Sequence, residues 1–177
     1  MVKKLLLVLL LLVGVFVAVV STRPASYRVT RSTTIAAPPE KVFALINDYH
    51  QWAAWSPWAR LDPNMKVTYD GPASGVGSSY QWTGNSAVGE GRMTTLESRP
   101  GEYVKIKLEF LKPFESNSIA EFALKPEGSG TVVSWDMTGQ ADFMTKAFTL
   151  FSSMDSMVGP DFEKGLQQLK ARAESSN

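Results

Sequence analysis

The feature that most constrains the fold is a series of short alternating stretches between residues 65 and 138, separated by turns. Within residues 103–110, apolar side chains take the even positions and charged ones most of the odd positions. Successive side chains of a strand point to opposite faces of a sheet, so this alternation predicts strands with one apolar face. Glycine and proline separate the stretches, as at residues 126–130, which predicts tight turns and an antiparallel meander. We expect strands at residues 27–35, 65–70, 78–83, 88–97, 103–110, 116–125 and 131–138.

Apolar residues change to helical spacing on either side of the later strands. Residues 40–49 carry an apolar stripe that predicts a short helix, and a second short helical turn with three tryptophans follows. Between residues 143 and 169 apolar residues recur every three or four positions, which predicts one long amphipathic helix. Gly159 and Pro160 interrupt this pattern, and we expect a kink or short break there because proline lacks a backbone N–H.

The N-terminus carries an uninterrupted apolar run from residue 5 to residue 20, preceded by Lys3 and Lys4. Sixteen helical residues span about 24 Å, somewhat less than a hydrocarbon core of about 30 Å. The basic start and the short run also fit a secretory signal peptide, but no good cleavage site of small residues follows. We therefore favour an uncleaved transmembrane signal anchor over a cleaved signal peptide.

These patterns predict an anchor at residues 1–21, a linker at 22–26, a folded domain at 27–174 and a tail at 175–177. The basic N-terminus favours an orientation with that end inside and the domain exported, on the periplasmic or another extracytoplasmic side. If the anchor is cleaved, the domain is secreted or periplasmic and soluble.

Composition excludes several kinds of chemistry. The 177 residues include no cysteine and one histidine, which excludes disulfides, iron–sulfur clusters, thiol nucleophiles and the usual zinc sites. A net charge of +1 gives no basic footprint for nucleic acid. Residues 22–177 carry 16 basic and 17 acidic side chains, so no polybasic surface is expected to hold the domain on a membrane. We predict no cofactor, no metal and no nucleic-acid partner, and leave a protein partner open.

Four motifs carry a resemblance to a known superfamily. They are residues 35–43 (IAAPPEKVF), Trp52-x-x-Trp55-Ser56-Pro57-Trp58, Gly75-Val76-Gly77, and residues 130–139 (GTVVSWDMTG). With the order of elements, they resemble the START-like (SRPBCC) helix-grip superfamily, in its polyketide cyclase/dehydrase and lipid-transport-like branch with an N-terminal membrane anchor. The resemblance implies an α+β fold. A curved antiparallel sheet of about seven strands wraps a long C-terminal helix, with two short helices and a separate N-terminal transmembrane helix. It also implies a cavity between sheet and long helix.

Large apolar side chains on the inner strand faces, near the tryptophan cluster and on the long helix are the candidates to line that cavity. An equally admissible interpretation is that they fill a core, because large aromatics usually do so. Aromatic and methionine side chains would suit a flat or flexible apolar ligand. The candidates are Trp55, Trp58, Tyr80, Trp82, Phe110, Phe122, Trp135, Met137, Phe148, Phe151 and Met154.

Glu90 and Arg92 are the candidate polar anchors for a ligand. They lie two residues apart on one expected strand and therefore share a face. If that face points inward they form a buried pair, and if it points outward they are ordinary solvated charges, which we favour. His50 is conceivable as a general base, but a lone histidine at a helix end is more often a surface or capping residue. We assign no catalytic residue.

The leading hypothesis is a membrane-tethered domain that binds a small hydrophobic or lipid-like molecule. One alternative is a cyclase/dehydrase-like enzyme that uses the same cavity. The other is a protein-interaction module of the chaperone-activator type, which an exposed apolar patch containing the tryptophan cluster would favour.

Overall fold

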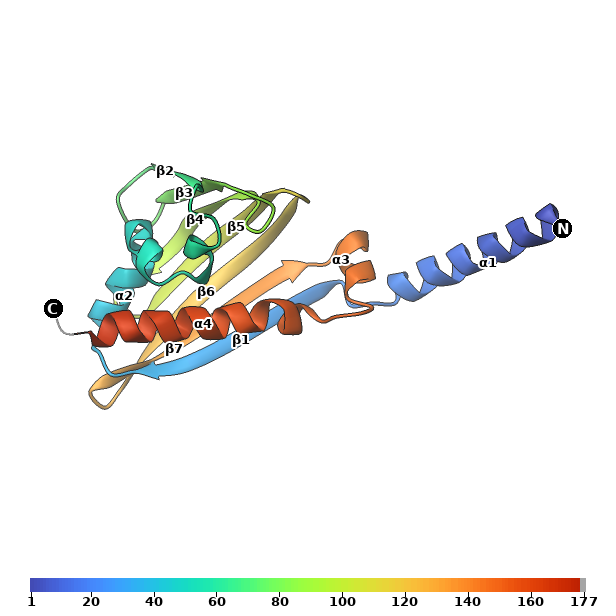
Figure 1. The fold of residues 1–177 in the computed structure, drawn as a ribbon. Helices are drawn as coiled ribbons and strands as arrows, with labels where there is room; N and C mark the ends of the chain where they lie inside the picture. Colours follow the sequence, from blue (N-terminus) through green and yellow to red (C-terminus); the bar gives the residue numbers. More distant parts are fainter. Residues whose placement is uncertain (176–177) are drawn as a thin grey trace.

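A seven-stranded antiparallel sheet organises the domain (Figure 1). The structure is a computed structural model, which describes residues 1–175. The strand order is β1-β7-β6-β5-β4-β3-β2, so the chain meanders from β2 to β7 and β1 closes the far edge on β7. The expected meander is confirmed. The strands are β1 (Ser26–Ile35), β2 (Lys66–Asp70), β3 (Ser79–Thr83), β4 (Glu90–Arg99), β5 (Tyr103–Lys112), β6 (Ser116–Glu127) and β7 (Gly130–Gln140).

Helices cover one face of the sheet and close one end. The longest helix of the domain, α4, lies along the sheet, and α2 sits at the end near the C-terminus (Figure 1). Pro39 and Glu40 suit the first turn of α2, where a missing N–H costs nothing and a negative charge meets the helix dipole. The helices are α1 (Val2–Ser21), α2 (Pro39–Asn47), the 3₁₀ helices η1 (Tyr49–Ala54) and η2 (Pro57–Arg60), α3 (Phe143–Phe148) and α4 (Met154–Glu174). This is the helix-grip arrangement that the sequence predicts.

The expected position of the break in the C-terminal helix is wrong. The chain breaks between α3 and α4, before Ser153, and Pro160 lies inside α4. The hydroxyl of Ser153 accepts a hydrogen bond from the backbone N–H of Ser156, which caps the new helix. Serine and threonine side chains that bond to nearby backbone groups favour such helix ends. Pro160 removes only one backbone donor near the start of α4, and the helix continues through it.

The N-terminal helix α1 extends away from the domain (Figure 1). It has 20 residues and is about 30 Å long, enough to cross a hydrocarbon core of about 30 Å. The apolar run of residues 5–20 alone would span only about 24 Å. Nearly all of its side chains are exposed, but Val20 at its end is fully buried. That end contacts α3, and Arg23 Nη2 donates a hydrogen bond to the carbonyl of Thr149 at 2.8 Å.

Aromatic rings hold α4 against the sheet. The ring of Trp135 on β7 stacks on Phe162 of α4 at 4.0 Å between centroids, and on Phe122 of β6 at 4.8 Å. Gly165 lets α4 come this close, because a Cβ there would lie 2.8 Å from the Trp135 ring. Trp55 meets Trp135 edge-on at 5.9 Å. Such pairs add to the free energy of burial, so this stack is the centre of the core.

Asp136 on β7 is a largely buried carboxylate, 9% exposed. We predict that its ionised form stabilises the fold and that this contribution is lost in acid. It accepts hydrogen bonds from Arg28, at 2.7 Å from Nη2, and from Thr30 and Ser134. Burial alone would raise its pKa, but the hydrogen bonds from Thr30, Arg28 and Ser134 lower the pKa of Asp136 below its usual value. A lowered pKa in the folded state stabilises the fold above the unfolded pKa, and the contribution is lost as the pH falls through the folded pKa.

We therefore expect Asp136→Asn to lower the free energy of unfolding at pH 7 by about 1–3 kcal/mol, the cost of losing hydrogen bonds to a charged group. The variant and the parent should converge as the pH falls through the lowered pKa of Asp136, because the parent carboxylate then becomes protonated too. Urea unfolding of the full chain in detergent, followed by tryptophan fluorescence from pH 2 to pH 7, measures both effects. Glu102→Gln, at an exposed turn, is the control. A difference that persists undiminished at pH 2 would contradict the assignment.

Candidate ligand-binding cavity

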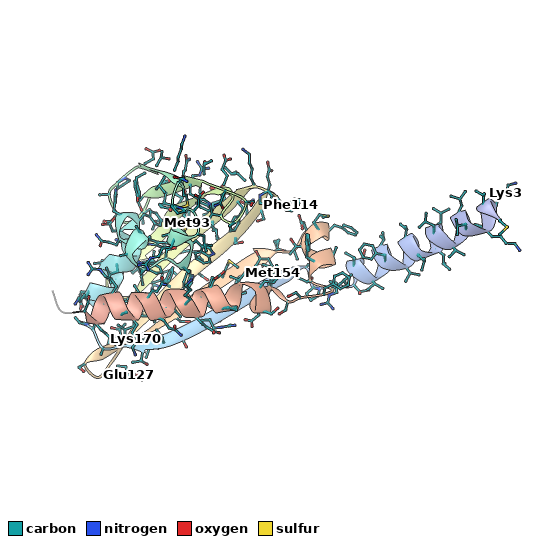
Figure 2. All side chains as sticks on the ribbon, in the orientation of Figure 1. Lys3, Met93, Phe114, Glu127, Met154 and Lys170 are labelled. Atoms are coloured by element: carbon teal, nitrogen blue, oxygen red, sulfur yellow. The ribbon has the colours of Figure 1, made fainter. Side chains whose placement is uncertain are left out.

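A cavity of about 500 Å³ lies between the inner face of the sheet, α4, α3 and the tryptophan segment. Figure 2 shows Met93 and Met154 in the space between sheet and α4, and Phe114 at the tip of the β5–β6 hairpin. Eight of the eleven predicted lining residues do line it. They are Trp58, Tyr80, Trp82, Phe110, Trp135, Met137, Phe148 and Met154. Strand alternation directs most of these side chains inward, as the sequence predicts.

The other three predicted residues lie elsewhere. Trp55 and Phe122 are fully buried in the core, where their rings meet edge-on at 6.2 Å. The indole of Trp55 also donates a hydrogen bond to the carbonyl of Leu45 at 2.9 Å, which anchors it to α2. Phe151 is 87% exposed, because the break between α3 and α4 places it in a loop rather than on a helix face. None of the three is part of the cavity wall.

The tryptophan segment thus divides between core and cavity. Trp52 donates to the carbonyl of Ile46 at 2.8 Å and is buried, but unlike Trp55 it also borders the cavity. Trp58, in η2, packs edge-on against Trp135 and reaches the cavity. This segment therefore does not form the exposed apolar patch that would favour the interaction-module hypothesis.

The predicted polar anchors, Glu90 and Arg92, are on the outer face of the sheet. The intervening Gly91 faces inward, where the Trp82 ring covers it so closely that a Cβ would lie 2.5 Å from the ring. Alternation then forces the two charged side chains outward. Glu90 pairs with Lys112 at 2.7 Å, and Arg92 pairs with a glutamate of β5 at 3.2 Å. They are solvated surface pairs, so the anchor prediction is wrong and its alternative holds.

More methionines line the cavity than the sequence predicts, which names only Met137 and Met154. Six of the seven methionines line the cavity, and the seventh is Met1. The six are Met65, Met93, Met137, Met144, Met154 and Met157. Alternation along β4 indicates that Met93 points inward, and the helical spacing in the last third of the chain includes Met154 and Met157. The unbranched, polarisable methionine side chain adapts to ligands of varied shape, so the cavity wall can change shape to fit a ligand.

Apolar side chains form most of the cavity wall, and polar groups are a minority of it. Asp142 accepts the backbone N–H of Thr145 at 2.7 Å and so caps α3, and these hydrogen bonds lower its pKa. Tyr80 is a half-buried lining residue, and burial raises its pKa to about 12. It therefore stays a neutral hydroxyl at physiological pH, able to donate or accept one hydrogen bond.

His50 lies outside the cavity. Its Nδ1 is 2.7 Å from Asp48, and its ring stacks on Tyr69 at 4.0 Å. The interpretation as a surface residue at a helix end therefore holds. Within residues 1–175, no three histidine, aspartate or glutamate side chains gather in a way that could hold a metal ion.

Comparison with known families agrees with this geometry. The model of the family described as polyketide cyclase/dehydrase and lipid transport matches residues 26–174. The chain belongs to this family. The match covers every strand of the sheet as well as α2, α3 and α4, and it leaves residues 1–25 and 175–177 outside. No curated protein matches the chain.

Solved structures share the fold. Protein CV1439 of Chromobacterium violaceum is 20% identical, with a TM-score of 0.61, over 87% of this chain and 100% of that one. The Aha1 protein of Colwellia psychrerythraea, solved as a dimer, is 16% identical with a TM-score of 0.60 over 84% and 96%. The di-domain ARO/CYC protein StfQ of the steffimycin pathway is 11% identical with a TM-score of 0.61, over 85% of this chain and 51% of StfQ. At these identities the likeness shows the fold alone.

Proposed function

We propose that this protein binds a small hydrophobic or lipid-like molecule in the cavity between the sheet and α4, while α1 tethers it to a membrane. The observation that carries the proposal is the cavity wall of six methionines and several aromatic rings. A volume of about 500 Å³ falls within the range of small-molecule pockets, about 300–1,000 Å³. A wall with so few polar groups selects for apolar surface rather than for a particular functional group.

The membrane part of the proposal rests on α1. Its length matches a bilayer core and its side chains are exposed, as expected of a helix whose surroundings are lipid. We propose that its N-terminus is inside and the domain is exported, in keeping with the two lysines that precede the apolar run. Tethering raises the local concentration of the domain at its source of apolar ligand.

A cyclase-like enzyme is the second candidate, and the Tyr80 hydroxyl inside the cavity is the observation that favours it. A neutral hydroxyl can orient a carbonyl by hydrogen bonding without a titratable partner. Tyr80→Phe separates the two functions. A binding protein should keep its affinity for an apolar ligand within a few-fold, whereas an enzyme that relies on this hydroxyl should lose turnover.

The binding proposal predicts saturable uptake of one fatty-acid-like probe per chain. The full chain in nanodiscs is titrated with a dansyl-labelled fatty acid, and energy transfer is measured from the tryptophans that line the cavity, including Trp58 and Trp82. The label should accept energy only when it is close to these rings. Nanodiscs that hold α1 alone give the background from partition into lipid. A signal that never exceeds this background would refute the proposal.

A further inference from the structure

We propose that the mouth of the cavity lies in the surface of the same bilayer that α1 crosses, so that apolar ligand passes directly between membrane and cavity. The inference rests on the proposed function, since it takes α1 to be a membrane anchor. It adds a membrane-contacting surface made of α3, the loop at residues 149–153, the first turn of α4 and the tip of the β5–β6 hairpin. We call this surface the apolar rim.

Exposed large apolar side chains gather at the apolar rim. The most exposed is Phe151 at 87%, and Phe114 follows at 60%. The others are about half exposed. The rim comprises Phe114, Phe143, Met144, Phe148, Phe151 and Met157. A soluble surface seldom exposes so many large apolar side chains in one place, and such patches mark contact with a membrane or a partner.

The same rim borders the cavity. Phe114, Met144 and Phe148 are partly exposed to solvent and also line the cavity. Phe143 and Phe151 do not line it, and both are exposed. These exposed side chains have no role in holding a ligand within the domain, but they are expected of a segment that inserts into the lipid surface. A rim that is apolar both inside and outside gives a ligand a continuous path from lipid to cavity.

The N-terminal helix holds the rim close to the bilayer. Val20, the buried residue of α1, lies at the end of the helix that contacts α3. Arg23 donates a hydrogen bond to the carbonyl of Thr149, just after α3. Only four residues separate the end of α1 at Ser21 from the start of β1 at Ser26. Fully extended, that link spans at most about 17 Å, so the domain cannot leave the membrane surface. The rim is on the side of the domain from which α1 departs (Figure 1).

The charges at the rim are mixed. Arg23 follows α1 and Lys146 lies on α3, and the acidic Glu115 and Asp142 flank Phe114 and Phe143. Basic residues next to apolar ones are typical of segments that lie in the interface of a bilayer, where phosphates meet hydrocarbon. The end of α1 contacts α3 beside these residues, so a lipid surface, rather than a second copy of the chain, is the occupant that this rim fits.

The absence of cysteine makes the test direct, because single cysteines can carry a nitroxide label. The full chain is reconstituted in phosphatidylcholine and phosphatidylglycerol vesicles with the label at Phe151→Cys, or at Val76→Cys as the control. Val76 is 58% exposed but lies next to the end of α2, where Gly75 bonds the carbonyl of Asn47. We expect oxygen to relax the label at residue 151 more than a water-soluble nickel chelate does, and the reverse at residue 76.

Equal, water-like accessibility at both positions would overturn the inference. Spin–spin broadening at residue 151 that disappears on dilution of the protein in lipid would also overturn it, since a second copy would then cover the rim. Either result can occur with intact probe binding in nanodiscs, in which case the proposed function stands and only the inference falls. If the parent chain does not bind the dansyl-labelled fatty acid in nanodiscs, the proposed function is refuted instead.

A second measurement connects the rim to ligand entry. Phe151→Asp leaves the cavity wall unchanged, so the affinity for the dansyl-labelled fatty acid should remain within about twofold. Uptake of that probe from vesicles should become about tenfold slower, because burying a phenylalanine in lipid contributes about that factor or more. Val76→Asp should change neither quantity. Unchanged uptake by Phe151→Asp would contradict a role of the rim in entry.

Discussion

Trp135→Ala is expected to lower the free energy of unfolding by about 3–5 kcal/mol, the usual cost of removing a large aromatic from a core. The Trp135 ring lies stacked between Phe162 of α4 and Phe122 of β6. Its loss removes a stacking contact between α4 and the sheet and leaves a void that Gly165 cannot fill. Urea unfolding of the full chain in detergent, followed by circular dichroism, measures the loss.

Trp135→Phe should cost far less, within about 1.5 kcal/mol of the parent. Among the described residues, the buried Nε1 of Trp135 has no hydrogen-bond partner, so phenylalanine removes an unsatisfied donor while keeping a stacking ring. Trp55→Phe is the matched control, because that indole donates to Leu45 and its loss should cost about 1–3 kcal/mol more. If Trp135→Phe proves as costly as Trp55→Phe, the indole of Trp135 must be bonded after all.

The second large effect is expected on binding. Ala120 lies on the inner face of β6 and lines the cavity opposite Met137. Ala120→Phe places a ring where a ligand would lie, so the Kd for the dansyl-labelled fatty acid should rise by about tenfold or more. The reason is steric, since forcing extra atoms into occupied apolar space costs about 1–3 kcal/mol. Energy transfer from the tryptophans in nanodiscs measures the Kd.

The control for Ala120→Phe is Ala123→Phe on the same strand. Ala123 is an odd residue of β6 and lies on the outer face. Both variants add the same ring to the same strand, but only Ala120→Phe adds it inside the cavity. Ala123→Phe should therefore keep the parent affinity. Parent-like affinity in Ala120→Phe would mean that the ligand binds elsewhere and would remove the main support for the proposed function.

Alternation and helical spacing predicted most of the fold correctly, because these periods depend only on local backbone geometry. The strand at Tyr103–Lys112 is the clearest example, with every even residue from 104 to 108 pointing inward. In β4 the same logic left two alternatives, since neither the face with Glu90 and Arg92 nor the opposite face, with Gly89, Gly91, Met93 and Thr95, is clearly apolar. Packing of the Trp82 ring over Gly91 decided the matter.

The C-terminal helix shows a different limit. Pro160 is the strongest helix breaker in its segment, yet the chain breaks earlier, where Ser153 caps α4 and where the end of α1 packs against α3. The contact of Arg23 with Thr149 links residues 126 positions apart, and no local pattern encodes such a distance. The exposure of Phe151 follows from this break, and so does the apolar rim.

The sequence by itself determined the direction of most side chains, the apolar N-terminal helix and the resemblance to the family. Only the tertiary structure decided which inward side chains meet and which leave space between them. Trp55 and Trp58 stand three residues apart, but the first is sealed in the core and the second lines the cavity. A cavity is the difference between the volume that the backbone encloses and the volume that side chains fill, and the enclosed volume depends on how far α4 stands from the sheet.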